Sequence, residues 1–238
     1  MNGITLAVSK RCVKEIPEVT SAWIRAGGRI KVVDRFWTKQ GVVSAETRLY
    51  GNGPFCETVA EASRLSLISP RDELLTELGK KWTRRKVEES AVSDITDDLF
   101  FNRGTIFVKP VEPKIFAASV FESSAEFQAI TKGLPSSTRV LVSEVVNFQN
   151  EARAFIVDGE IADCNFYIKD GDLSEAAKFV SSFVAEHIQD LPSTFVVDIG
   201  EVEDGWAVIE FNSTWASHPR QCNPNLILPC IAAGTLGR

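Results

Sequence analysis

Apolar residues are spaced along the chain in the two ways that indicate strands and helices. Short apolar or alternating runs indicate strands, whereas apolar residues three and four positions apart indicate one buried face of a helix. These patterns predict strands at residues 4–8, 30–33, 105–109, 115–121, 139–146, 152–157, 161–168, 194–200 and 206–212. They predict helices at residues 14–26, 69–81, 124–132 and 173–188, and after Pro224.

Local signals mark several ends of these elements. Ser69, followed by Pro70 and an acid in the first turn, is typical of a helix start, with the serine as N-cap. The Asp158-Gly159 pair predicts a tight hairpin turn, and Gly-Asn-Gly-Pro at 51–54 predicts another turn. Residues 90–103 are polar and acidic, and therefore predict a loop.

The order of these elements favours an α+β fold with mostly antiparallel strands. Strict βαβ alternation, which would indicate a doubly wound parallel sheet, is not present. Residues 1–70 predict a small α/β lobe with too few strands to bury a large core alone. The chain also contains no Gly-x-Gly-x-x-Gly and no Walker-type phosphate loop, so a bound nucleotide would have to be held in another way.

Composition and charge narrow the class of protein. The 238 residues are 44% hydrophobic and 24% charged with a net charge of −6, which is ordinary for a soluble globular protein and disfavours nucleic acid as a partner, although it leaves room for a local basic groove. The five cysteines are widely spaced and only two histidines occur, so a zinc site and a disulfide framework are both disfavoured. No apolar run approaches the roughly 18 residues that span a membrane. A cytoplasmic protein is therefore expected.

Two carboxylates and an amide interrupt the two most apolar neighbouring strands. Asp198 lies in Thr-Phe-Val-Val-Asp-Ile-Gly (194–200), and Glu210 and Asn212 lie in Trp-Ala-Val-Ile-Glu-Phe-Asn (206–212). Period 2 places Glu210 and Asn212 on one face, and a hairpin would bring Asp198 opposite them. Oxygen ligands in this arrangement suit a hard cation, and magnesium carrying nucleotide phosphates is the commonest case. The alternative is a surface hairpin with solvated acids.

Further polar residues stand at the ends of predicted strands upstream. Lys109 ends the strand Ile-Phe-Val-Lys-Pro (106–110), and Lys114 follows in the next loop; the alternative for both is a solvated loop lysine. The segment after Glu144 leaves its strand, so the backbone groups of Val145 and Val146 are suited to an adenine edge. Glu151 is suited to a ribose hydroxyl, although the segment taken alone favours a simple Glu151–Arg153 pair.

Arginines provide candidate phosphate and carboxylate ligands. Arg84 and Arg85 lie in the basic segment Trp-Thr-Arg-Arg-Lys (82–86), which is either a solvated helix end or a phosphate clamp. Arg220 follows Asn212 by eight residues, in a loop that also contains His218. Arg220 is therefore placed to neutralise a substrate carboxylate or an acyl-phosphate.

Taken in order, these segments resemble an ATP-grasp domain over roughly residues 80–220. The segments are Phe-Val-Lys-Pro with Lys109, Ser-Glu-Val-Val with Glu144, Glu-Ala-Arg with Glu151 and Arg153, Val-Asp-Ile-Gly with Asp198, and Glu-Phe-Asn with Glu210 and Asn212. The chain is most similar to a clade of small bacterial and phage ATP-grasp proteins in which arginine replaces the first ATP-binding lysine. Arg85, or alternatively Arg84, would take that place.

The resemblance implies two α+β subdomains that clasp ATP, at about residues 81–143 and 144–238, preceded by an α/β lobe at 1–80. It implies that Arg85, Lys109 and Lys114 contact phosphates, that Glu144, Val145 and Val146 contact adenine, and that Glu151 contacts ribose. Asp198, Glu210 and Asn212 would hold magnesium, and Arg153 and Arg220 would be catalytic.

The implied activity is an ATP- and magnesium-dependent ligase that joins a small-molecule or peptide carboxylate to an amine. Many such ligases carry an arginine two residues before the first metal aspartate, and here Val196 stands at that position. Steadying of the acyl-phosphate would therefore fall to Arg153 or Arg220. The alternative is a nucleotide-binding protein of the same fold without catalysis.

Overall fold

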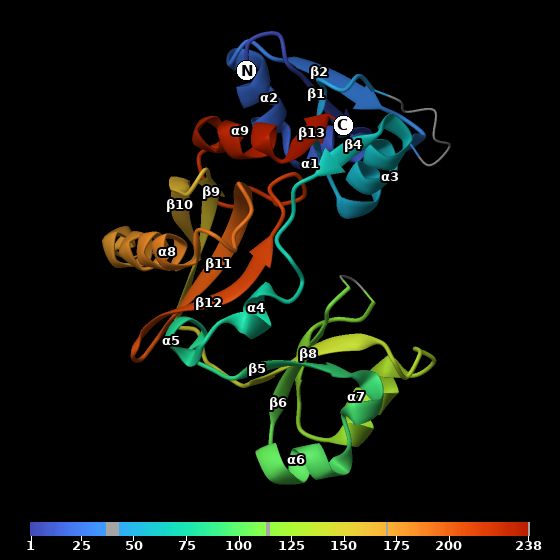
Figure 1. Cartoon of the computed structure of the whole chain (residues 1–238), viewed down its shortest axis with the longest axis vertical. Coiled ribbons are helices and arrows are strands. Elements are labelled where there is room, and N and C mark those ends of the chain that lie inside the picture. The colour runs from blue at the N-terminus through green and yellow to red at the C-terminus, as the bar shows by residue number, and fades with distance from the viewer. Residues whose placement is uncertain (37–42, 113–114, 170, 238) are drawn as a thin grey trace. The chain divides into compact units, whose positions relative to one another are not determined.

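The computed structural model describes residues 1–36, 43–112, 115–169 and 171–237, which form two compact units. Unit 1 comprises Met1–Pro70, Asn150–Gly200 and Ile209–Arg238, and unit 2 comprises Arg71–Gln149 and Glu201–Val208. Helices and strands carry the labels of Figure 1. The mixed helices and strands confirm the predicted α+β class.

Unit 1 begins with a parallel sheet of three strands in the order β2-β1-β3. Its strands are β1 (Thr5–Ser9), β2 (Arg29–Val33) and β3 (Arg48–Tyr50), and its helices are α1 (Lys10–Glu15), α2 (Pro17–Arg25) and α3 (Gly53–Ser63). The predicted single helix at 14–26 is wrong, because Pro17 opens a second helix. The predicted turn at 51–54 is instead a helix start, where the Asn52 side chain accepts a hydrogen bond from the Phe55 amide.

The second sheet of unit 1 has the order β10-β9-β11-β12. Its strands are β9 (Asn150–Val157), β10 (Glu160–Ile168), β11 (Thr194–Val202) and β12 (Gly205–Asn212), although the last residues of β11 and the first of β12 count with unit 2. The helices α8 (Leu173–His187) and α9 (Pro224–Ala233) and the antiparallel pair β4 (Leu65–Leu67) and β13 (Thr235–Gly237) complete the unit. The predicted Asp158-Gly159 hairpin is confirmed, and both residues have positive φ.

The two sheets of unit 1 share a hydrophobic core. Leu6 and Trp23 from the N-terminal segment pack in one cluster with Phe155 of β9, Val196 of β11 and Ile231 of α9. The first and last parts of the chain are therefore joined by burial of apolar surface. The division into a 1–80 lobe and an 81–238 domain stays a prediction.

Unit 2 is built on an antiparallel sheet in the order β5-β8-β6-β7. Its strands are β5 (Val87–Ala91), β6 (Ile106–Pro110), β7 (Ser119–Phe121) and β8 (Arg139–Glu144), and its helices are α4 (Leu74–Glu77), α5 (Lys80–Thr83), α6 (Asp97–Arg103) and α7 (Ser124–Thr131). Apolar residues of α6, α7, β6 and β8 form its core.

Three local predictions in unit 2 are wrong. The helix predicted at 69–81 is two short helices separated by Gly79, and the first of them begins only at Leu74. The loop predicted at 90–103 contains the end of β5, a 3₁₀ turn at Val92–Asp94 and α6. Asp97 and Asp98 lie in the first turn of α6, where the helix dipole favours negative charge. Of the strand predicted at 115–121, only Ser119–Phe121 is a strand.

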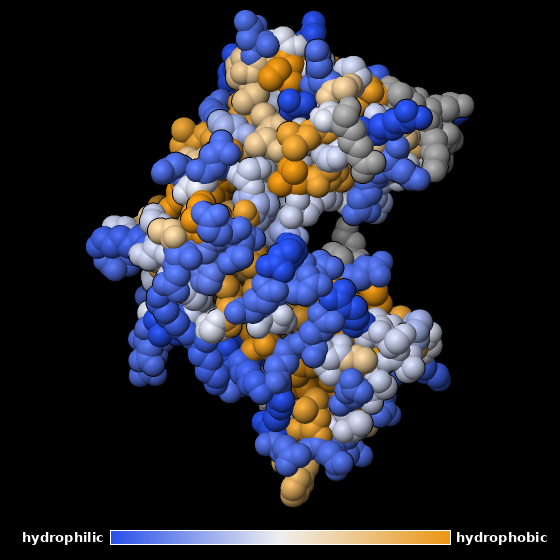
Figure 2. Space-filling view, in the orientation of Figure 1, coloured by the Kyte–Doolittle hydropathy of each residue, from blue (hydrophilic) through white to orange (hydrophobic). Residues whose placement is uncertain are grey.

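The molecular surface is mostly hydrophilic on the face that Figure 2 shows, with small hydrophobic areas among the polar ones. Large apolar side chains with high exposure are scattered over several elements, and the most exposed is Phe101 of α6 at 89%. Such scattered residues are normal on a globular protein. Within the described residues, no helix combines the length and the apolar character that crossing a membrane requires.

Candidate functional site

Strands β11 and β12 bring Asp198, Glu210 and Asn212 into contact. Seven successive residues of β11 from Thr194 are buried, and Asp198 among them is only 2% exposed. Asn212 Nδ2 donates to Asp198 Oδ2 at 3.3 Å and to Glu210 Oε1 at 3.0 Å. The surface-hairpin alternative therefore does not describe Asp198, and the role of the three residues as metal ligands stays a prediction.

Arg153 on β9 holds Asp198 in a bidentate ion pair. Its Nε lies 2.7 Å from Asp198 Oδ1 and its Nη2 lies 2.6 Å from Oδ2, while Nη1 donates to the carbonyl oxygen of His218 at 2.7 Å. Arg153 is 7% exposed, so both charges are removed from water. The partner of Arg153 is thus Asp198, and not Glu151 as the alternative had it.

The charges of this cluster are suited to a hard cation. Burial raises the pKa of Asp198 above its ordinary value, and the neighbouring Glu210 carboxylate raises it further. Arg153 compensates one of the two carboxylates, which leaves one negative charge and several oxygen lone pairs for a metal. Ligation by Asn212 would require its amide to turn, because Nδ2 faces the acids.

The donor set is small for a complete metal site. Within the described residues, no three His, Cys, Asp or Glu side chains form a group that could hold a metal ion. The cluster offers two carboxylates and one amide, which suits magnesium that obtains further oxygens from phosphates and water.

An aromatic ring that the sequence analysis missed lies beside this cluster. The centroid of the Tyr167 ring is 5.9 Å from Cζ of Arg153 and 5.3 Å from Cζ of Arg220. Burial raises the pKa of the Tyr167 hydroxyl, as do the charge of Asp198 and a hydrogen bond to Glu151. The phenol therefore stays protonated and donates to Glu151. No spacing signal marks Tyr167, since its position depends on an irregularity of β10.

Unit 2 contains the residues predicted to contact phosphates and adenine. Lys109 on β6 is half-buried, on the strand face opposite the buried Val108. Strand β8 ends at Glu144, two residues before the predicted end at Val146, and the backbone of Val146 makes no hydrogen bond within the described part of the chain. Val145 is 47% exposed. The segment after β8 is therefore accessible to a ligand of unit 2.

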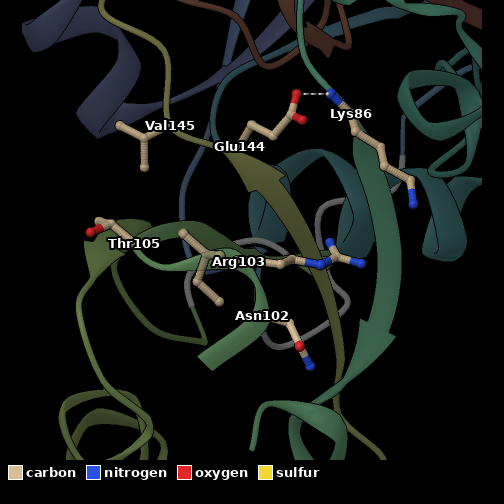
Figure 3. Close-up of a pocket in the computed structure, with 7 residues that line it drawn as sticks. Lys86, Asn102, Arg103, Thr105, Glu144 and Val145 are labelled. Carbon is tan, nitrogen blue, oxygen red and sulfur yellow. Dashed lines mark hydrogen bonds between the residues drawn. The ribbon is translucent and has the colours of Figure 1, made fainter. Parts of the chain in front are cut away.

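Glu144 and Val145 line a pocket of about 480 Å³ in unit 2 (Figure 3). The Glu144 carboxylate accepts a hydrogen bond from the Lys86 amide at 2.8 Å and from Lys80 Nζ at 2.9 Å, which together lower its pKa. The other lining residues are Lys86, Asn102, Arg103, Thr105 and Ile106. The sequence analysis named none of these five as site residues, and it missed Asn102 and Arg103 because α6 was predicted to be a loop.

The arginines predicted to replace the first lysine bind the backbone. Arg85 is 6% exposed, and its Nη1 donates to the carbonyl oxygens of Thr83 at 3.0 Å and Val208 at 2.9 Å. Burial lowers the pKa of Arg85 to about 10. Arg84 Nε donates to the carbonyl oxygen of Trp206 at 3.3 Å. Contacts of either arginine with phosphate stay predictions, and the predicted ligand Lys114 lies outside the described residues.

Comparison with solved structures identifies the fold. The chain is similar to the RimK domain ATP-grasp protein of Sphaerobacter thermophilus, with 13% identity, a TM-score of 0.63 and coverage of 97% and 98% of the two chains. It is similar to the D-alanine–D-alanine ligase of Bacillus anthracis complexed with ATP, with 12% identity, a TM-score of 0.60 and coverage of 98% and 96%. It is also similar to the ATP-grasp ligase PsnB complexed with a phosphomimetic variant of its minimal precursor, Mg and ADP, with 13% identity, a TM-score of 0.59 and coverage of 98% and 97%.

Sequence comparison gives the family directly. None of the curated proteins matches the chain in sequence. A family model described as an ATP-grasp domain, family 2 of the R-2-K clade, matches residues 82–230, which is more than half of the chain. The chain therefore belongs to this second family of the clade, within the ATP-grasp domains.

Proposed function

We propose that this ATP-grasp protein is an ATP- and magnesium-dependent ligase that joins a carboxylate to an amine through an acyl-phosphate. The observation that carries the proposal is the contact of the buried Asp198 with the half-buried Glu210 and Asn212, which concentrates negative charge and oxygen donors in one sheet of unit 1. Bound magnesium would be held by these three residues and would neutralise phosphate charge.

The proposed ligase reaction has two steps, formation of an acyl-phosphate and attack on it by the amine. A carboxylate oxygen of the acceptor attacks the γ-phosphorus of ATP, the bond from that phosphorus to the bridging oxygen breaks, and ADP leaves with the electron pair. The amine nitrogen then attacks the acyl carbon, inorganic phosphate leaves, and one amine proton passes to solvent. Protein residues contribute positioning and charge neutralisation rather than covalent chemistry.

We assign the nucleotide contacts to the residues that the resemblance to ATP-grasp domains implies. Lys109 would bind phosphate, while Glu144, Val145 and Val146 would contact adenine. Glu151 would bind a ribose hydroxyl, because its carboxylate is held by Tyr167 and keeps further acceptor sites. Arg85 and Lys114 would complete the phosphate set, and Arg153 and Arg220 are the two candidate catalytic arginines.

Similar solved structures and the proposed chemistry support one class of substrate. Structures similar to this one include a ligase complexed with a precursor peptide and a D-alanine–D-alanine ligase. We therefore expect an amino acid or peptide carboxylate as one substrate and an amine as the other. All five cysteines are free thiols, and a cytoplasmic location agrees with this and with the need for ATP.

A second candidate is a nucleotide-binding protein without turnover. Two observations favour it, namely the valine at 196 and the engagement of Arg153 by Asp198, which withdraws one of the two candidate catalytic arginines. In this case magnesium–ATP would bind and ADP would not form.

One experiment separates the two candidates. The purified chain is incubated with magnesium–ATP and a panel of amino acids, peptides and amines, and ADP release is measured beside ATP binding by calorimetry. ADP release that needs both a carboxylate and an amine supports the ligase. Binding without release across the panel supports the second candidate, and absence of magnesium-dependent ATP binding contradicts both.

A further inference from the structure

The two candidate catalytic arginines differ in how strongly they are already engaged. Arg153 uses three of its five N–H groups inside the protein, two for Asp198 and one for the carbonyl oxygen of His218. It is also buried at 7% exposure. Moving this guanidinium to a substrate would take two hydrogen bonds from the buried Asp198 carboxylate, which is unfavourable.

Arg220 is exposed and is held at its backbone rather than at its guanidinium. Its amide donates to Nδ1 of His218 at 2.9 Å, and its φ of 59° lies in the left-handed region. Among the described residues, no carboxylate lies within ion-pair distance of the Arg220 guanidinium.

The loop that carries Arg220 is fixed on both sides of this residue. The Tyr50 hydroxyl donates to the carbonyl oxygen of Ser217 at 2.7 Å, and Asn165 Nδ2 donates to the carbonyl oxygen of Gln221 at 3.0 Å. The loop backbone therefore presents Arg220 from a defined position, and only the long side chain needs further restraint.

A β-bulge places Tyr167 where it can provide that restraint. Strand β10 pairs Phe166 with Ala152 and Ile168 with Glu151, so Tyr167 is the extra residue between two paired positions. Such a bulge redirects a side chain from the regular alternation of the strand. The ring lies within cation–π distance of both arginines, with its centroid 5.3 Å from Cζ of Arg220 and 5.9 Å from Cζ of Arg153.

We propose that Tyr167 is a positioning residue whose ring holds the Arg220 guanidinium for the phosphoryl group in transfer, while Arg153 serves Asp198. This inference rests on the proposed function and divides the work of the two arginines. A free arginine side chain samples many rotamers, and stacking on the Tyr167 ring restricts them. Arg220 would then meet the negative charge of the phosphoryl oxygens without reorganisation.

The test measures binding of a mimic of phosphoryl transfer, so it does not require the substrate to be known. Magnesium–ADP is titrated calorimetrically with and without aluminium fluoride, which imitates the phosphoryl group between donor and acceptor. The variants are Tyr167→Leu, Tyr167→Phe and Arg220→Ala. Arg64→Ala is the matched control, because Arg64 is also exposed in unit 1 with a left-handed φ of 55°.

In the wild-type chain, aluminium fluoride should tighten binding of magnesium–ADP. In Tyr167→Leu and in Arg220→Ala, the factor by which aluminium fluoride tightens binding should be at least about tenfold smaller, since a charge-assisted contact contributes about this much affinity. The gain is the ratio of the two affinities measured for one variant, so a change in the affinity for magnesium–ADP alone, such as one caused by release of Glu151 from Tyr167, does not enter the comparison. Tyr167→Phe keeps the ring and should retain the gain, as should Arg64→Ala. The double variant Tyr167→Leu with Arg220→Ala should lose no more of this gain than Arg220→Ala alone, because both substitutions remove the same interaction.

Four outcomes would overturn the inference. Equal gains in wild type and Arg220→Ala overturn it, even if Tyr167→Leu does not fold. Loss of the gain in Tyr167→Phe as well would also overturn it, because the hydroxyl rather than the ring would then matter. Binding of magnesium–ADP by wild type without any gain from aluminium fluoride overturns the inference but leaves nucleotide binding intact. Absence of magnesium–ADP binding contradicts the proposed function together with the inference.

Discussion

The Arg153–Asp198 pair of unit 1 and the Lys80–Glu144 pair of unit 2 are held in opposite ways. Asp198 is 2% exposed and is paired with Arg153 inside a sheet. Glu144 stands at a strand end, and its partner Lys80 has a side chain that is 61% exposed. The first pair lies in a medium of low dielectric, whereas the second is surrounded by solvent.

This difference determines which residues the fold itself depends on. A buried ion pair gives little net stability, but removal of one partner is costly because the other charge stays buried. An exposed pair is worth little in either direction. The Arg153–Asp198 pair of unit 1 is therefore part of the core, whereas the Lys80–Glu144 pair of unit 2 lies at the surface, where its loss costs little stability.

Replacement of Arg153 by alanine tests this contrast most strongly. Because Asp198 would be left buried and unpaired, the free energy of unfolding should fall by about 3–5 kcal/mol. Urea denaturation followed by tryptophan fluorescence measures it. The control Arg64→Ala should change the value by less than about 0.5 kcal/mol. Equal effects of the two substitutions would show that the buried pair does not have this structural importance.

Glu210→Gln separates stability from metal binding in the same cluster. The substitution keeps the shape of the side chain, so the fold should be retained. Wild type with magnesium–ATP at 100 times its dissociation constant should gain about 2.7 kcal/mol of stability. The variant should lose most of the part of this gain that requires magnesium. Thermal unfolding with ATP, with and without magnesium, gives the comparison, and an undiminished magnesium effect would remove Glu210 from the metal site.

The contact among Asp198, Glu210 and Asn212 could be predicted from the sequence, because it depends on local rules. Glu210 and Asn212 share a face through the period of a strand, and a short turn returns the chain beside Asp198. The ion pair with Arg153 was not predictable from these rules. It arises because β9 lies beside β11 in the sheet, and pairing between strands distant in sequence leaves no local signal.

Errors in unit 2 have another physical origin. Acidic residues favour both loops and the first turn of a helix, so Asp97 and Asp98 were assigned to a loop although they begin α6. That error hid Asn102 and Arg103, which line the pocket. The sequence also could not show that Arg85 would be buried, since its partner Val208 is 123 residues away.

Lys109→Ala removes a single predicted contact with phosphate in unit 2. Loss of a charged hydrogen bond to phosphate should weaken ATP binding by about tenfold, while stability changes little. Lys132→Ala is the control, because Lys132 is an exposed lysine of the same unit, at the end of α7. Calorimetric titration with ATP measures both variants. An unaltered dissociation constant in Lys109→Ala would exclude its phosphate role.

Lys80→Ala is expected to have the smallest effect. Lys80 Nζ lies 2.9 Å from both carboxylate oxygens of Glu144, yet both side chains are more than half exposed. The free energy of unfolding should fall by about 0.5 kcal/mol at low ionic strength, and the difference should disappear in about 1 M salt, where the screening length is about 3 Å. Urea denaturation at the two salt concentrations measures this. The salt test contrasts directly with Arg153→Ala, whose effect should persist because salt does not reach the buried pair. A salt-independent loss in Lys80→Ala would mean that Glu144 is held as firmly as Asp198, and the distinction between the two regions would not hold.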